Sequence, residues 1–176
     1  MLVALAALPA HADDAPPPPT PFDQGRVSIT GGGGTSFSLG HHYIVIGGGV
    51  GYYVLDGVEL SLRAMEQFGE NDGRGLDVPN IAELSPQLRY VAQPLVAHSP
   101  VVPYVGVFYN HWFIGDDYKD FDTIGARAGA LLVSGKIVFG LGVVVEHVLT
   151  TCNSEGPACV YVDDSVYPDI TLGFTL

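Results

Sequence analysis

Basic residues, cysteines and long hydrophobic runs are scarce in this 176-residue chain. Seven Lys and Arg stand against 19 Asp and Glu, which gives a net charge of −12 at pH 7. Proteins that bind nucleic acid use Lys and Arg to neutralise phosphates, so this balance argues against a nucleic-acid partner. The longest apolar run, at 137–145, is interrupted by glycines and followed by Glu146. A bilayer-spanning helix needs about 20 apolar residues, so no stretch after the N-terminus is expected to cross a membrane as a helix.

The composition is nevertheless apolar, with 47% hydrophobic residues and only 15% charged ones. Val, Ile, Leu, Tyr and Phe are too plentiful for an intrinsically disordered chain. The 23 glycines disfavour a helical bundle, because each one costs about 1 kcal/mol in a helix interior. The length suits one domain. What remains is an all-β or mixed domain that is unusually apolar for its charge content.

The N-terminus has the pattern of an export signal. An apolar run opens the chain, and Ala10-His11-Ala12 fits the small-x-small sequence at which signal peptides are cleaved. We therefore expect a signal peptide at 1–12, although the basic stretch that normally precedes the run is missing, which leaves open a start upstream of Met1. The alternative, a membrane-spanning helix, would need a longer run. The proline-rich residues 13–24 predict an extended linker, and the domain proper is expected over 25–176.

Apolar and polar residues alternate along most of the remaining chain. In the stretch 58–64, for example, Val58, Leu60 and Leu62 alternate with charged or hydroxyl side chains. A period of two is typical of a strand whose two faces meet different surroundings. The glycines at 31–34 are expected to end the first strand. The alternating segments lie at about residues 25–31, 42–54, 57–68, 81–92, 102–113, 123–133, 137–149 and 165–176.

The connections between these segments alternate in length. Tight turns are expected at 55–56 and 134–136, while the link 93–101 falls at a short position but is longer than the pattern favours. Alternating long loops and short turns on an even number of strands are typical of transmembrane β-barrels. The sequence thus predicts an all-β fold, an eight-stranded antiparallel up-and-down transmembrane β-barrel. Its long links are expected at 32–41, 69–80, 114–122 and 150–164.

Charged residues on the strands indicate which face points inward. In a soluble barrel, apolar residues point inward and charged residues coat the outside. Here arginines and acids share the polar strand faces, and the opposite faces carry almost no charge. Because Arg suits bidentate pairing with carboxylates, we expect a charge network inside the barrel and lipid contact outside. The expected network comprises Arg26, Glu59, Arg63, Glu83, Arg89, Arg127, Glu146 and Asp169.

Aromatic residues are expected to form girdles where the outer face of the barrel meets the membrane interfaces. The alternative to a membrane barrel is a soluble sandwich with ordinary half-buried strands. The aromatic residues considered for the girdles are Tyr52, Tyr90, Tyr104, Phe108, Trp112 and Phe174.

Three stretches resemble a known family. Residues 47–60 are similar to the second and third strands of small bacterial outer-membrane β-barrels of the OmpA-transmembrane-domain, OmpW and OmpX type, and 84–90 with 102–106 resemble their fourth and fifth strands. The resemblance implies residence in the outer membrane of a Gram-negative bacterium, contact with its lipid and lipopolysaccharide, and recognition by the outer-membrane assembly machinery. A monomer is expected. The alternating residues that match the family's assembly signal are Ile170, Leu172, Phe174 and Leu176. The signal usually ends in an aromatic residue, and Leu176 departs from that pattern.

No stretch carries a complete catalytic or cofactor-binding motif. The glycines at 47–51 do not complete the dinucleotide pattern, and Gly135-Lys136 lacks the Ser or Thr of a P-loop. Small residues in a crowded barrel interior explain such glycines better. The histidines lack the spacing of zinc ligands, so no metal site is predicted. The acidic loop residues predict a solvated rim that can bridge to lipopolysaccharide through shared cations.

Cys152 and Cys159 are the only cysteines and share the longest expected loop. In an exported protein, an even pair this close predicts a disulfide. A redox site would normally have the C-x-x-C spacing, so we interpret the pair as a structural staple. The loop it closes is small, which places its stabilisation at the low end of about 2–4 kcal/mol.

Three functions remain for such a barrel. We expect a structural or surface-interaction role, non-enzymatic and without cofactor. The first alternative is a narrow channel for small or apolar solutes, as the OmpW resemblance suggests. The second is a barrel-embedded lipid-modifying enzyme, which would need a Ser–His–acid set at one rim. His147 with Thr150 and His111 with Asp116 come nearest, and neither brings a serine at usable spacing.

Overall fold

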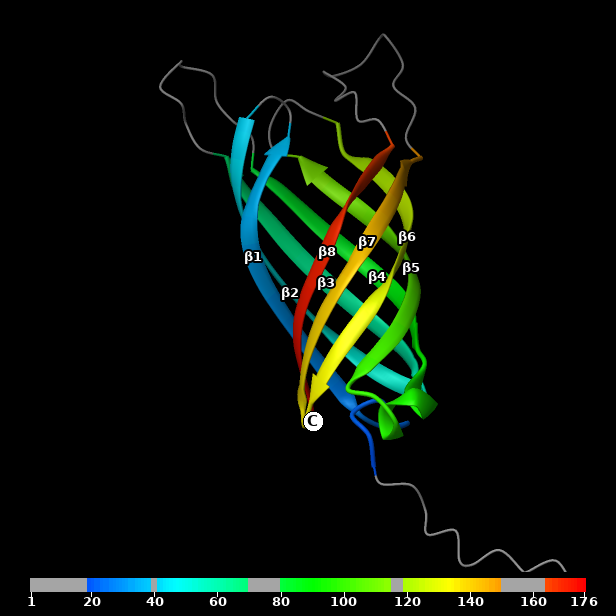
Figure 1. Ribbon diagram of the computed structural model, residues 1–176. Helices are drawn as coiled ribbons and strands as arrows, with labels where there is room; N and C mark the ends of the chain where they lie inside the picture. The colour runs from blue at the N-terminus through cyan, green and yellow to red at the C-terminus, as the bar shows by residue number, and fades with distance from the viewer. Residues whose placement is uncertain (1–18, 39–40, 70–79, 115–118, 150–163) are drawn as a thin grey trace, which may run out of the picture.

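The protein is a closed barrel of eight antiparallel strands, seen here in a computed structural model that describes residues 19–38, 41–69, 80–114, 119–149 and 164–176 (Figure 1). Each strand pairs with the next along the chain, and β8 returns to β1, so the up-and-down topology expected from the alternating pattern is confirmed. A short 3₁₀ helix, η1 (Gln93–Ala97), joins β4 and β5. The strands are β1 (Val27–Ser38), β2 (His41–Leu55), β3 (Val58–Gly69), β4 (Ile81–Val91), β5 (Val101–Ile114), β6 (Phe121–Ser134), β7 (Ile137–Val148) and β8 (Ser165–Thr175).

The first strand is longer than the sequence pattern predicts. The expectation that the glycines at 31–34 end it is wrong, because β1 continues to Ser38. All twelve residues of β1 pair with β2, and this backbone ladder holds glycines extended in spite of their low strand propensity. The long link expected at 32–41 is therefore only two residues, 39–40, which lie outside the described part of the chain.

The two ends of the barrel differ in their connections. At the short-turn end, β2 joins β3 through Asp56-Gly57 and β6 joins β7 through Gly135-Lys136. Both glycines have positive φ, 74° and 60°, which a tight turn between strands requires and glycine adopts without strain. The opposite end, called the long-loop end below, carries the links from β3 to β4, from β5 to β6 and from β7 to β8. Residues 19–26 and the C-terminus both lie at the short-turn end (Figure 1).

Apolar side chains cover the outside of the barrel. On β3 the lumen-facing residues Glu59, Arg63 and Gln67 are buried or half-buried, whereas Leu60 and Leu62 on the other face are exposed. Exposed Val, Ile, Leu, Tyr and Phe occur on all eight strands. A soluble sandwich would bury this face, so the arrangement fits the expected barrel with polar residues inside. Among the described residues, no helix is long and apolar enough to cross a membrane.

The aromatic residues divide between the two faces. Tyr52, Tyr90 and Phe174 point outward and are 40–50% exposed, as expected for girdle positions. Tyr104 and Phe108 are buried inside the barrel instead, and Trp112 on the same strand also faces the lumen. Both faces of β5 are apolar, so the period of two could not show which set of residues points inward; here the expectation is corrected.

The main hydrophobic core fills the short-turn end. Phe22 comes from the end of the segment expected as a linker, and it is fully buried against β-strand residues. The backbone of this segment is fixed to the turn between β2 and β3, because Gly57 N–H donates to Phe22 O at 2.8 Å. The barrel is therefore closed at this end by side chains. The buried residues of the cluster are Phe22, Tyr53, Val91, Val102, Tyr104, Leu131 and Val138.

Candidate functional site

The lumen has two parts with different contents. The half next to the short-turn end, called the packed half, is filled by the core described above and by two groups of charged side chains. The half next to the long-loop end contains a cavity of about 720 Å³, called the lumen cavity. The two charged groups of the packed half and the lumen cavity thus follow one another along the barrel.

Glu59 and Arg89 form the first charged group of the packed half. Their strands are paired with Glu59 opposite Arg89, and Arg89 Nη2 lies 2.5 Å from Glu59 Oε2. The side chains are only 2% and 12% exposed. Ser28 donates a second hydrogen bond to the Glu59 carboxylate, and Arg89 also donates to the Tyr53 hydroxyl at 3.4 Å. A buried carboxylate with a cation and a hydroxyl donor has its charge compensated.

Asp169 and Arg127 form the second group. Arg127 Nη1 lies 3.5 Å from Asp169 Oδ2, and the Tyr104 hydroxyl donates to the same oxygen at 2.8 Å. The guanidinium of Arg127 also lies over the Phe108 ring, 5.0 Å from its centroid, as a cation–π pair. Both charges are nearly buried, with side-chain exposures of 9% and 7%.

Glycines make room for these groups. A Cβ at Gly51 would overlap the Glu59 carboxylate and the Ser28 hydroxyl. A Cβ at Gly142 would lie 2.5 Å from the Tyr104 hydroxyl, and one at Gly125 would overlap the Phe108 ring. Gly51 thus serves the crowded interior, as interpreted from the sequence, whereas that interpretation is wrong for Gly135, which lies in a turn with a φ of 60° and open space around it.

The other members of the expected network do not join these pairs. Arg26 lies at the start of β1, beside Asp23 at the short-turn end. Arg63 faces the lumen, but in the part of the chain that the structure describes it has no ion pair within 4.0 Å, and Glu83 on the neighbouring strand stays beyond that distance. Glu146 is held by neutral donors instead of an arginine.

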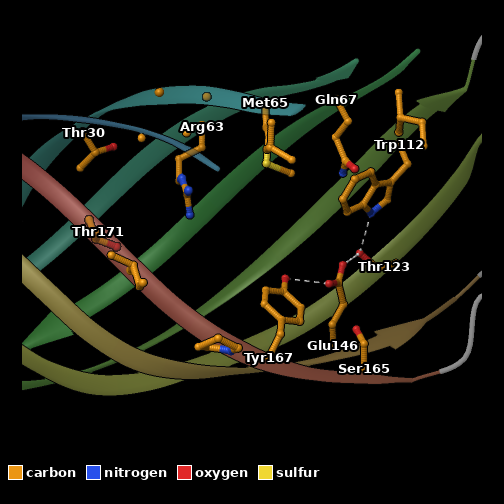
Figure 2. A pocket seen from close by; sticks show the side chains of 18 of the residues that line it. Thr30, Arg63, Met65, Gln67, Trp112, Thr123, Glu146, Ser165, Tyr167 and Thr171 are labelled. Carbon is orange, nitrogen blue, oxygen red and sulfur yellow. Dashed lines mark hydrogen bonds between the residues drawn. The ribbon is translucent and has the colours of Figure 1, made fainter. Parts of the chain in front are cut away.

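Glu146 lies in the wall of the lumen cavity (Figure 2). Asn110 Nδ2 donates to its Oε1 at 2.8 Å, the Thr123 hydroxyl donates to the same oxygen, and the Tyr167 hydroxyl donates to Oε2 at 2.9 Å. Trp112 Nε1 in turn donates to Thr123 Oγ1 at 3.2 Å. Three donors from three strands stabilise the buried carboxylate without a cation. No local sequence pattern predicts this cradle, because its members are separated along the chain and meet only through strand register.

The rest of the cavity wall is largely apolar. Trp112 stacks on Phe121 with a 5.6 Å centroid distance, and both pack against a small buried cluster of Tyr43, Ile81 and Ile114. Arg63 lies at the side of the cavity nearest the packed half (Figure 2). The principal apolar lining residues are Val45, Met65, Ile81, Trp112, Ile114, Phe121, Val148 and Ile170.

The remaining predicted residues lie elsewhere. Cys152 and Cys159 fall outside the described residues. Ile170, Leu172 and Phe174 of the expected assembly signal are exposed on the outer face of β8, and Leu176 follows the strand. No group of three or more His, Cys, Asp or Glu that could hold a metal is found among the described residues.

Two histidine–carboxylate pairs that the sequence did not reveal lie near the long-loop end. His111 Nδ1 is 2.7 Å from Asp122 Oδ1, and His147 Nδ1 is 2.6 Å from Asp164 Oδ1. The Tyr109 hydroxyl also donates to Asp122. Both pairs are partly or largely exposed on the surface, and neither lines the lumen cavity.

Comparison with known proteins shows which solved structure has a similar fold. No family model matches the chain, and no curated protein matches its sequence. Among solved structures, the chain is similar to the N-terminal β-barrel domain of Pseudomonas aeruginosa OprF, with 19% sequence identity and a TM-score of 0.57. The similarity covers 87% of this chain and 98% of that domain. The resemblance to small outer-membrane barrels is therefore confirmed at the level of the fold.

Proposed function

We propose that the protein is a bacterial outer-membrane β-barrel with a structural and surface-interaction role, non-enzymatic and monomeric. The observation that carries this proposal is the apolar outer surface on all eight strands around a charged, packed interior. Only a membrane removes such a surface from water without another protein. The similarity of the fold to the OprF barrel domain supports the same location.

The long-loop end is assigned to the cell exterior and the short-turn end to the periplasm. Transmembrane barrels carry their longer loops outside and their short turns inside. The partners of this surface would be lipopolysaccharide and outer-membrane lipid, and assembly into the membrane would use the outer-membrane assembly machinery.

Fractionation and gel migration test the membrane location. The exported protein should be recovered with the outer membrane, and in mild SDS it should migrate differently before and after boiling, because a closed hydrogen-bonded sheet resists detergent. Recovery of the folded protein in the soluble periplasmic fraction would contradict the proposal.

A channel for small or apolar solutes is the second candidate, because the lumen cavity would admit such solutes at one end. The buried core at the short-turn end, including Phe22 at 0% exposure, opposes passage through the barrel. Planar-bilayer recordings distinguish the two: the structural role predicts little steady conductance, whereas stable openings of the unmodified protein favour the channel.

A further inference from the structure

The wall between β1 and β8 is only partly closed. These strands pair over four residues each, Ser28–Gly31 with Leu172–Thr175, whereas β1 and β2 pair over twelve. Toward the long-loop end both strands continue, β1 to Ser38 and β8 from Ser165, without pairing to each other. Figure 1 shows them diverging in that direction. This unpaired stretch is called the seam below.

The residues at the seam suit an opening. Gly32 pairs with Gly47 and faces the lumen, and a Cβ placed there would meet nothing within 4 Å, so no side chain narrows the inner mouth of the seam at this position. Pro168 on β8 has no backbone N–H to donate, and proline in sheets is confined to edge strands and bulges. Pro86 shows the same effect elsewhere in the barrel, because the β4–β5 pairing is interrupted between Leu84 and Gln87.

The lumen cavity reaches the outer surface through the seam. Gly31, Gly33, Pro168 and Ile170 occupy outward-facing positions of their strands, yet all four line the cavity. Ile170 is 65% exposed. Backbone groups left unpaired in hydrocarbon cost several kcal/mol, so an open seam within a membrane favours an occupant or water from the lumen.

The charge inside the cavity indicates the chemistry of the occupant. Arg63 lies between the apolar wall and the packed half, close to Thr30 in the paired part of β1 and to Thr171 at the edge of the seam (Figure 2). Among the described residues it has no ion pair within 4.0 Å. Glu146, the other charge of the wall, already accepts three hydrogen bonds. A guanidinium of this kind favours a carboxylate, which it can bind through two parallel hydrogen bonds.

We propose that the lumen cavity binds a single-chain amphiphile with a carboxylate head, a fatty acid in chemical class, and that this ligand enters from the membrane through the seam. The carboxylate pairs with Arg63 beside the hydroxyls of Thr30 and Thr171, and the chain lies against Met65 and Trp112. The cavity volume of about 720 Å³ lies within the roughly 300–1,000 Å³ of small-molecule sites. Because the packed half is filled, the ligand is held and not conducted. This binding activity goes beyond the proposed structural role.

Trp112 provides a direct assay, because it is the only tryptophan of the chain and lines the cavity. The full barrel in phosphatidylcholine nanodiscs is titrated with brominated laurate, whose bromines quench tryptophan on contact. We expect saturable quenching well above that produced by brominated phosphatidylcholine, a two-chain lipid that remains in the bilayer. Equal quenching by both probes would overturn the proposal.

Recognition of the head is tested with Arg63→Gln, with Lys136→Gln at the short-turn end as the control that removes one cation outside the cavity. Arg63→Gln loses a charge-assisted hydrogen bond, so the concentration of brominated laurate at half-maximal quenching should rise about tenfold or more. Binding of the uncharged brominated dodecanol should change little, and the control should bind laurate as the unmodified barrel does. An equal effect of Arg63→Gln on both probes would refute the carboxylate site.

The route is tested by narrowing the inner mouth of the seam at Gly32, which faces the lumen beside it. Gly32→Leu should slow or abolish quenching, with Gly32→Ala intermediate, whereas Ala64→Leu on the outer face of β3 should have no effect. The shift in gel migration on boiling verifies that each variant is folded. Unchanged quenching rates in folded Gly32→Leu would show that the ligand does not use the seam. Failure of these tests would leave the outer-membrane location, measured by fractionation, unaffected.

Discussion

Breaking the Glu59–Arg89 pair should destabilise the barrel far more than removing both partners. The pair is buried, with side-chain exposures of 2% and 12% and a 2.5 Å contact. Removing one member of a buried pair leaves an uncompensated charge and typically costs about 3–5 kcal/mol. We therefore expect Glu59→Leu and Arg89→Leu each to lower the free energy of unfolding by an amount in this range.

The remaining contacts rank the two single variants. In Arg89→Leu, the Glu59 carboxylate keeps the hydrogen bond from Ser28, so the free energy of unfolding should fall by about 3 kcal/mol. In Glu59→Leu, the Arg89 guanidinium keeps the 3.4 Å contact with the Tyr53 hydroxyl and the Tyr104 ring at 5.9 Å, both uncharged, so the loss of unfolding free energy should be about 5 kcal/mol. The double variant buries no charge, and its main loss is the acceptor of the Ser28 hydroxyl, which is worth about 1–2 kcal/mol.

Urea unfolding in phosphatidylcholine vesicles, followed by Trp112 fluorescence, measures these differences. Trp112 lies in the other half of the lumen, so its signal reports loss of the barrel and not a local change at the pair. Lys119→Leu, which removes an exposed cation, is the control and should change stability by no more than about 0.5 kcal/mol. Additive single effects in the double variant would refute the pairing and show that the two side chains act independently.

Three further predictions concern other parts of the chain. Mass analysis of exported protein without reductant should show Cys152 and Cys159 joined, and two freely alkylated thiols would contradict the staple. Gly142→Val should lower the free energy of unfolding by about 1–3 kcal/mol, because its Cβ would lie 2.6 Å from the Ala128 carbonyl oxygen. Gly32→Ala, where a Cβ has open space, should change that free energy little. Equal losses for the two variants in chemical unfolding would refute this reasoning. Burial acts to raise the pKa of Asp23, but hydrogen bonds from Thr20 and Gln93 and the charge of Arg26 bring that pKa below its ordinary value. The stabilisation is therefore present above about pH 4, the unfolded value, and is lost as the pH falls through the lower folded value. Asp23→Asn should flatten the pH dependence of unfolding in this acid range, and an unchanged profile would contradict the assignment.

The alternation of residues determined most of the architecture by itself. Strand number, strand direction and the inward face of strands such as β3 follow from a period of two, which is a property of residues i and i+2. The turns follow from local chemistry in the same way: the turn at Gly135-Lys136 falls within the expected 134–136, and the one expected at 55–56 lies one residue later, at Asp56-Gly57, where glycine adopts the positive φ. These features need no knowledge of distant contacts, so the sequence predicts them well.

Closure of the sheet decided the rest, because register joins residues that are far apart in the chain. Only the β1–β2 ladder shows that β1 continues through its glycines, and only packing inside the barrel shows that Tyr104 and Phe108 point inward from a strand with two apolar faces. Glu59 meets Arg89, and Glu146 meets Tyr167 in place of an arginine, through cross-strand register. The seam arises because β1 and β8 pair over only four residues. That number depends on how eight strands are staggered around one axis, which no local pattern specifies.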